Sequence, residues 1–273
     1  MRVALIDNGS LEPQAHRQLR AVAAALSAAC GKTVAAVSWK HSDRIPAAAL
    51  GGEPAWTLAA WMRRERAAGE REFLVVPFFV SPQGAIGSAL RQDLDRLAGE
   101  LGQFTVRFTP GLAESGAVAP IVADRIAETI RAEDLRSPPV IVVDHGGPSA
   151  VSAALRDQVA AAVRARLAGS AGILAAASME SPAGPQYAFN RPLLAEQLRA
   201  PEFARGPVVI APLFLAPGRH AGPHGDLARI AALAQAEAPA QRCYFAGLIG
   251  SHPLAIEALS RALLSSLASG SSR

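Results

Sequence analysis

The chain has 273 residues, of which half are hydrophobic and 18% are charged, and this composition excludes disorder as its main state. Its 27 basic and 23 acidic side chains give a net charge of +4, which is small for this length. The basic cluster at Arg63–Arg66 is interleaved with acid and aromatic residues are few, so nucleic-acid binding is not expected.

The cysteine count and the apolar runs limit the compartment. Cys30 and Cys243 cannot build a disulfide framework or a cysteine-based metal site, which favours reduced thiols. The start of the chain reaches Asp7 before an apolar leader segment could form. The apolar runs all fall short of the roughly 18 residues that span a bilayer. We therefore expect a soluble, cytoplasmic protein with no membrane partner.

Short apolar runs alternate with longer stretches of helical spacing along the whole chain. The spacing of Leu19, Val22 and Leu26 after the first run illustrates the helical pattern. Strands that are apolar throughout, alternating with amphipathic helices, predict parallel sheets covered on both faces. The predicted strands are Val3–Ile6, Val34–Trp39, Phe73–Phe79, Thr105–Phe108, Val140–Val143, Ile173–Ala177, Val208–Phe214 and Cys243–Phe245.

The second half of the chain repeats the pattern of the first. Asp7–Ser10 corresponds to Asp144–Gly147, and Val76–Pro82 corresponds to Ala211–Pro217, at a nearly constant offset. The repeat predicts an α/β fold of two tandem Rossmann-like, flavodoxin-like domains. Each would be a mostly parallel four-stranded sheet flanked by helices. The expected domains are residues 1–132 and 139–268, joined by a linker that contains the Ser137-Pro138-Pro139 break.

Nucleotide-binding motifs do not occur in the sequence. Gly31-Lys32-Thr33 looks like the end of a phosphate-binding loop, but Leu26 stands where that loop needs its first glycine. Neither half has a G-x-G-x-x-G segment after its first strand, and there is no G-x-S-x-G elbow for a nucleophilic serine. We therefore expect no nucleotide requirement.

Histidines gather behind the predicted strands of the second half. His145, His220 and Glu180 follow three different strands, whose carboxyl ends meet at one rim of a parallel sheet. Imidazole and carboxylate suit divalent ions such as Co²⁺, Ni²⁺, Fe²⁺ or Zn²⁺, and they also supply bases near neutral pH. His224 and His252 also follow strands. Either can instead be explained by the start of a helix, so their roles stay open.

The first half serves as an internal control for this histidine and glutamate set. A group required by the fold itself would be expected in both halves. The corresponding positions there carry Asn8, Lys40, Ala85 and Gly116 in place of His145, Glu180, His220 and His252. The fold pattern persists while the donor set does not, which predicts a metal site in the second half only.

At these residues the sequence resembles the class II chelatases of the CbiX type, the sirohydrochlorin cobaltochelatase and ferrochelatase group. The resemblance rests on the strand that ends in Asp144-His145-Gly146-Gly147 and on Pro212-Leu213-Phe214-Leu215-Ala216-Pro217-Gly218-Arg219-His220. Glu180 looks like the family's acid after the second strand, and Gly250-Ser251-His252-Pro253 like its late Gly-x-His-Pro. The chain departs from the family at Gly147, where the family usually has serine.

The resemblance implies two chelatase-type lobes with a tetrapyrrole cleft between them. It also implies insertion of Co²⁺, Ni²⁺ or Fe²⁺ into sirohydrochlorin as the long, two-domain form, without ATP. On this hypothesis His145 and His220 bind the incoming metal, and Glu180 is a third ligand or a proton acceptor. The carboxylates of the substrate would be held by cationic side chains, for which Lys40, Arg91, Arg191 and Arg219 are the candidates.

Two other interpretations remain at this point. The protein could be a non-catalytic carrier of metal or tetrapyrrole derived from a chelatase, which would bind stoichiometrically instead of turning over. It could also be a two-lobed ligand binder of the periplasmic type, although the expected lack of an export signal disfavours this. A monomer and a homodimer are equally compatible with the sequence.

Overall fold

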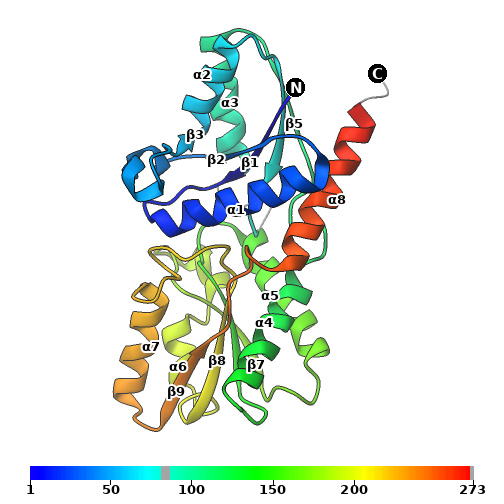
Figure 1. Cartoon of the computed structure of the whole chain (residues 1–273). Helices are drawn as coiled ribbons and strands as arrows, with labels where there is room; N and C mark the ends of the chain where they lie inside the picture. The colour runs from blue at the N-terminus through cyan, green and yellow to red at the C-terminus, as the bar shows by residue number, and fades with distance from the viewer. Residues whose placement is uncertain (81–86, 271–273) are drawn as a thin grey trace. The chain divides into compact units, whose positions relative to one another are not determined.

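The computed structural model describes residues 1–80 and 87–270, and it contains two α/β units (Figure 1). The first unit comprises Met1–Ser115 together with Gly250–Arg273, and the second comprises Gly116–Ile249. Each unit is built around its own parallel sheet, as the repeat predicted.

The sheet of the first unit has five parallel strands in the order β3-β2-β1-β4-β5. Its central strands are apolar and buried because helices cover both faces of such a sheet. The strands are β1 (Arg2–Asp7), β2 (Val34–Ser38), β3 (Trp56–Thr57), β4 (Glu72–Pro77) and β5 (Thr105–Phe108).

Four α-helices and two 3₁₀ turns complete this unit within the described residues. Helix α1 begins with Pro13, which suits a first helical turn, and it ends at Gly31, which adopts the left-handed conformation. The helices are α1 (Pro13–Cys30), α2 (Leu58–Ala67), α3 (Gly87–Leu101) and α8 (Pro253–Gly270), and the 3₁₀ turns are η1 (Ser42–Arg44) and η2 (Ala47–Leu50).

The second unit has a four-stranded parallel sheet in the order β7-β6-β8-β9. The strands are β6 (Val140–Asp144), β7 (Leu174–Ser178), β8 (Gly206–Pro212) and β9 (Gln241–Phe245). The valine and isoleucine side chains of β6 are fully buried at the centre of the sheet. Its helices are α4 (Val118–Ala132), α5 (Ala150–Arg166), α6 (Leu194–Arg199) and α7 (Asp226–Glu237), with the 3₁₀ turn η3 (Pro185–Asn190).

The structure confirms the predicted fold class and adds one strand. β3 has only two residues, too few to show a periodic pattern, and it makes the first sheet five-stranded instead of four-stranded. The units also divide at other points than the expected boundaries 1–132 and 139–268. Helix α4 packs on α5 and β8 of the second unit, whereas α8 packs on α1 of the first (Figure 1).

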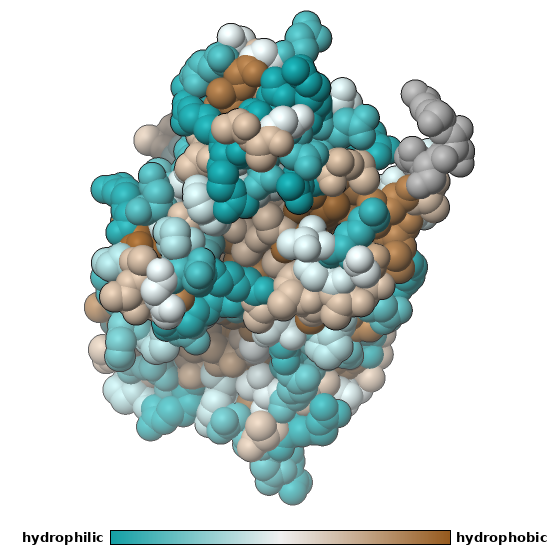
Figure 2. All heavy atoms as spheres, turned by 45° about the horizontal axis from the view of Figure 1, so that its top comes forward, coloured by the Kyte–Doolittle hydropathy of each residue, from teal (hydrophilic) through white to brown (hydrophobic). Residues whose placement is uncertain are grey.

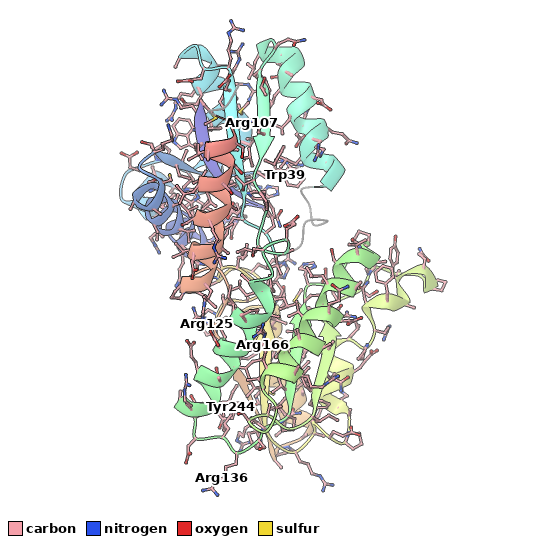
Figure 3. All side chains as sticks on the ribbon, turned by 90° about the vertical axis from the view of Figure 1, so that its right-hand side faces the viewer. Trp39, Arg107, Arg125, Arg136, Arg166 and Tyr244 are labelled. Carbon is pink, nitrogen blue, oxygen red and sulfur yellow. The ribbon has the colours of Figure 1, made fainter. Side chains whose placement is uncertain are left out.

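A hydrogen bond supports the assignment of α4 to the second unit. The guanidinium of Arg125 in α4, labelled in Figure 3, donates from Nε to the carbonyl of Leu248 at 3.2 Å, within the second unit.

In the described part of the chain, no helix is long and apolar enough to cross a membrane. On the face shown in Figure 2, hydrophobic residues occur in small groups among hydrophilic ones.

Candidate metal-binding site

The carboxyl ends of β6 and β7 bring His145 and Glu180 side by side. The parallel ladder continues past both strands, because Met179 N–H donates to Asp144 O at 2.8 Å and Glu180 N–H donates to His145 O at 3.1 Å. The two side chains are exposed, and His145 Nε2 lies 3.7 Å from Glu180 Oε1. The ladder thus fixes the backbones of both residues while their side chains stay free at the rim.

Gly146 allows this close approach. Its φ of 81° lies in the left-handed region, and a Cβ atom built on it would lie 1.8 Å from the carbonyl oxygen of Glu180. A side chain at this position would therefore push the two loops apart. The His-Gly pair seen in the sequence is explained by this contact.

His220 completes the group from a third loop, between β8 and α7. Its ring meets that of His145 edge-on, with centroids 4.6 Å apart and an interplanar angle of 85°. Phe214 lies beside both rings, at centroid distances of 6.4 and 6.3 Å. The structure thus brings the three predicted site residues of the second half to one rim.

The arrangement is open. Within the described residues, no group of three or more His, Cys, Asp or Glu side chains has the geometry to hold a metal ion. Glu180 is 60% exposed and His145 45% exposed, so solvent reaches both side chains where they meet. What the structure places together is a donor set, not a closed coordination shell.

The second ring nitrogen of each histidine is already engaged. His145 Nδ1 lies 2.8 Å from the carbonyl oxygen of Gly146, and His220 Nδ1 lies 2.6 Å from Oδ2 of Asp226. Asp226 is the first residue of α7, and its other carboxylate oxygen accepts from Arg229. The hydrogen bonds from Arg229 and from His220 lower the pKa of Asp226, which keeps this carboxylate ionised.

A buried arginine supports the rim from below. Arg156 of α5 is 2% exposed and donates to Ser178 Oγ at 2.5 Å, and Ser178 donates to Asp144 Oδ1 at 2.6 Å. Arg156 also donates to the carbonyl of Phe189 in η3 at 3.1 Å. Burial raises the pKa of Asp144, although Ser178 and Arg156 oppose that rise. One guanidinium therefore links the ends of β6 and β7 to the following turn.

Asn190 connects the two loops that carry His145 and Glu180. Its amide, 1% exposed, donates to the carbonyl of Gly147 at 2.9 Å and accepts from the N–H of Gly147 at 3.3 Å. The same amide nitrogen lies 3.3 Å from Ser181 Oγ, directly after Glu180. Both loops are therefore tied to one buried side chain.

Sequence reasoning missed Arg156, Asn190 and Asp226. Arg156 had a signal, since it is a charge on the helix face shared with Ala153 and Val159, where apolar residues are expected. Asn190 and Asp226 are ordinary residues for a turn and a first helical turn, and nothing in the sequence pattern set them apart.

The other predicted residues are placed elsewhere. His224 is exposed in the turn before α7, and His252 is buried in the first unit, where its Nδ1 accepts from Leu254 N–H at the start of α8. His252 is therefore a helix-start residue, the alternative that the following proline suggested. It does not belong to the unit that holds the donor set.

The four cationic candidates are all exposed, and three of them have acidic neighbours. Arg191 pairs with Glu196, while Arg219 is 83% exposed with its Nε 3.8 Å from Asp226. Lys40 lies over the ring of Trp39, labelled in Figure 3, and 3.6 Å from Asp93. The fourth, Arg91, lies over the Phe108 ring at 5.6 Å. Lys40 and Arg91 belong to the first unit and Arg191 and Arg219 to the second.

The first unit repeats the backbone of the rim with other side chains. A Cβ atom on Gly9 would lie 1.7 Å from the carbonyl oxygen of Lys40, as one on Gly146 would from Glu180. Lys40 N–H also donates to Asn8 O, at 3.3 Å. This geometry confirms that Asn8 and Lys40 occupy the places of His145 and Glu180. Ala85, expected opposite His220, lies outside the described residues.

Comparisons with known proteins agree with this fold. Over 100% of this chain and 98% of the other, the structure is similar to "SirB from Bacillus subtilis with Fe3+", with 13% identity and a TM-score of 0.66. A sirohydrochlorin chelatase SirB from Bacillus subtilis subspecies spizizenii in complex with cobalt gives 15% identity, coverages of 96% and 94%, and a TM-score of 0.66.

A third solved structure and a family model complete the comparisons. CbiX, described as the terminal enzyme for biosynthesis of siroheme in denitrifying bacteria, shares 17% identity over 97% of this chain and 99% of its own, with a TM-score of 0.62. No curated protein matches the sequence significantly. The CbiX family model matches residues 139–266, the segment that carries His145, Glu180 and His220. The family model thus matches the second half of the chain, and it confirms the resemblance of that segment to class II chelatases of the CbiX type.

Proposed function

We propose that the protein is an ATP-independent chelatase that inserts a divalent metal ion into sirohydrochlorin. The observation that carries the proposal is the meeting of His145, His220 and Glu180 at one rim of the unit that matches the CbiX family. Co²⁺ is the first candidate metal, with Ni²⁺ and Fe²⁺ next, because the donor set suits all three ions. We place this activity in the cytoplasm, where Cys30 and Cys243 would stay reduced.

The chemistry requires an exchange of charges that this donor set can support. Insertion of a dication into the macrocycle releases two protons from pyrrole nitrogens, so metal donors and proton acceptors must face the same ring. In the proposed mechanism His145 and His220 hold the incoming ion through imidazole nitrogen. As the ion leaves for the ring, the exposed carboxylate of Glu180, beside His145, accepts one of the two protons, and an imidazole nitrogen freed by the ion accepts the other. An open donor set suits an ion that must be released.

The substrate carries carboxylates, and the cationic side chains of the rims are the proposed partners for them. Arg191 and Arg219 would act in the second unit, and Lys40 and Arg91 in the first. Since Arg191 and Lys40 already have acidic partners, a substrate carboxylate would have to compete with Glu196 and Asp93 for them. Each such contact is exposed, so its contribution to affinity should be small.

The proposal is tested by an anaerobic absorbance assay of sirohydrochlorin with Co²⁺, Ni²⁺ and Fe²⁺ in turn. We expect many turnovers per protein molecule with at least one metal, without ATP. A single stoichiometric change in the spectrum would instead identify a carrier of metal or tetrapyrrole. Activity that appears only after ATP is added would contradict the proposed chelatase class.

A further inference from the structure

We propose that Asp226 is a positioning residue that fixes the tautomer of His220, so that Nε2 of this imidazole is the metal-binding atom. The carboxylate of Asp226 lies 2.6 Å from Nδ1 of His220, a distance typical of a charge-assisted hydrogen bond. An ionised carboxylate can only accept a hydrogen bond. The proton of the neutral ring must therefore reside on Nδ1, and the lone pair on Nε2.

The loop between His220 and α7 holds this pair in register. Asp226 N–H donates to Arg219 O and Leu227 N–H donates to His220 O, both at 3.1 Å. A Cβ atom on Gly225 would lie 2.5 Å from the carbonyl oxygen of His220, so only glycine fits where the loop folds back. The path of this loop therefore brings the backbone of Asp226 close to His220, so that the short aspartate side chain reaches the imidazole.

His145 is set in the same tautomer by a different acceptor. Its Nδ1 lies 2.8 Å from the carbonyl oxygen of Gly146, and a carbonyl oxygen cannot donate. In the neutral form each of the two rings, whose centroids lie 4.6 Å apart, therefore has its lone pair on Nε2. The opposite tautomer would direct an N–H group toward the cation and remove that donor. Second partners of this kind commonly orient metal-binding histidines.

A purely structural role for Asp226 makes a different prediction. Asp226 lies in the first turn of α7 and pairs with Arg229, three residues along the helix, so it could simply stabilise the helix start. Loss of that role would lower stability and leave the tautomer of His220 unchanged. Because one carboxylate oxygen faces Arg229 and the other faces His220, the two roles can be separated by substitution.

The test measures the tautomer directly in the full chain without metal. Long-range ¹H–¹⁵N correlation spectra of histidine-labelled protein distinguish Nδ1–H from Nε2–H, and a His220→Gln variant assigns the signals. The asparagine amide of Asp226→Asn can donate to Nδ1, so we expect this variant to shift His220 toward the Nε2–H form. Its affinity for Co²⁺ alone should fall by about 10–100-fold.

Two further variants act as matched controls. Arg229→Gln removes the ion pair but keeps the contact with His220, so the tautomer and the Co²⁺ affinity should stay close to those of the parent. Asp226→Glu keeps a carboxylate and should retain the Nδ1–H form. It also serves if Asp226→Asn does not fold, since a Glu variant with the Nε2–H form would contradict the proposal.

The outcomes separate this inference from the proposed function on which its metal role rests. An unchanged tautomer and Co²⁺ affinity in Asp226→Asn would overturn it. Equal losses of Co²⁺ affinity in Asp226→Asn and Arg229→Gln, without a change of tautomer, would also overturn it in favour of helix stabilisation. If the tautomer and the Co²⁺ affinity change as expected but the parent protein turns over no sirohydrochlorin, the role of Asp226 stands and the chelatase proposal fails.

Discussion

The two rims share a backbone and differ in almost everything attached to it. In both units a left-handed glycine, Gly9 or Gly146, packs against the carbonyl of the residue that follows the neighbouring strand. Next to this shared glycine–carbonyl contact the first unit carries Asn8 and Lys40, and the second carries His145 and Glu180. The fold therefore needs the glycine but not the side chains of the proposed donor set, which makes that set an addition to the fold and not a part of its packing.

The buried carboxylates below the rims differ in the same way. Asp144 shares Ser178 with the buried guanidinium of Arg156, which is the seventh residue of α5. The seventh residue of α1 is Leu19, which is 1% exposed and apolar. Burial raises the pKa of Asp7 to about 6, despite its hydrogen bonds with Ser38 and Gly9. The second unit thus has a charged support under its donor set, where the first has a buried apolar side chain at the equivalent helix position.

Removal of the donor set should have the largest effect. We expect His145→Ala and His220→Ala each to lower the rate of metal insertion by about 100-fold or more, because each imidazole holds the incoming ion and can accept a pyrrole proton once the ion has left. Both side chains lie at the rim, so circular dichroism and thermal unfolding should match the parent. His41→Ala, which replaces the exposed histidine directly after Lys40 in the first unit, is the control. Parental insertion rates in both site variants would refute the assignment.

Replacing Arg156 of the second unit by leucine, the residue at the equivalent position of the first unit, should mainly lower the stability of the fold. Arg156→Leu leaves the carboxylate of Asp144 buried without its cation, and we expect a loss of about 3 kcal/mol in the free energy of unfolding. Urea denaturation measures this loss. The double variant Arg156→Leu, Asp144→Asn should recover part of it, because the amide needs no counterion. If the single variant is as stable as the parent, the guanidinium does not support the rim.

The first unit should reveal opposing pH effects. The pKa of Asp7 is raised from 3.8 to about 6 by burial, so its stabilising contribution is present below pH 3.8 and is lost as the pH rises toward 6. The pKa of His16 is lowered from 6.5 to about 4, first by burial and then by Arg20, so its contribution is present above pH 6.5 and is lost as the pH falls. Each of the two groups changes the free energy of unfolding by about 3 kcal/mol, and the two changes with pH have opposite signs.

Single substitutions should separate these two effects. Urea denaturation between pH 4 and 6 should show nearly constant stability for the parent. In Asp7→Asn the stability should rise with pH, because only the histidine effect remains. In His16→Leu it should fall with pH, because only the carboxylate effect remains. Identical slopes in the two variants would show that neither group has the shifted pKa.

The smallest effect is expected at Lys40. We predict that Lys40→Ala raises the KM for the tetrapyrrole by less than about threefold, because the lysine is 48% exposed and already pairs with Asp93. The affinity for metal should not change, since Asn8 and Lys40 replace the donors of the second unit. Lys32→Ala is the control, as the other lysine of the chain. A weakened metal affinity in Lys40→Ala would contradict the prediction that only the second unit holds the metal.

Much of this architecture could be predicted because parallel sheets leave a strong pattern in sequence. Apolar strands and the internal repeat identified both sheets, and the rule that carboxyl ends share a rim brought His145, Glu180 and His220 together. His252 also follows a strand, but the structure assigns it to the start of α8, in the other unit. Alternation of strands and helices says which face of a helix is buried, but not which sheet buries it.

The supporting contacts of the site could not be predicted for a different reason. Asn190 and Asp226 act through contacts that depend on the exact path of a loop, and loop paths are set by packing and by local turns that have no periodic signature. The histidines were recognisable by chemistry alone, whereas their partners become recognisable only when the distances are known. What the pattern predicts is the set of donor residues, and not the atoms through which they would act.

Because α4 packs in the second unit and α8 in the first, the two units become complete at different times during synthesis. The second unit is one continuous stretch, Gly116–Ile249, while the first is interrupted and needs α8 from the last residues of the chain. As the chain leaves the ribosome, the unit with the donor set is complete first, although it comes second in sequence. The first unit stays incomplete, with the face of α1 that receives α8 uncovered, until α8 has been synthesised. The chain thus has the organisation of one domain inserted into another, and a chain that has emerged from the ribosome only as far as residue 249 contains the whole unit with the donor set but lacks α8.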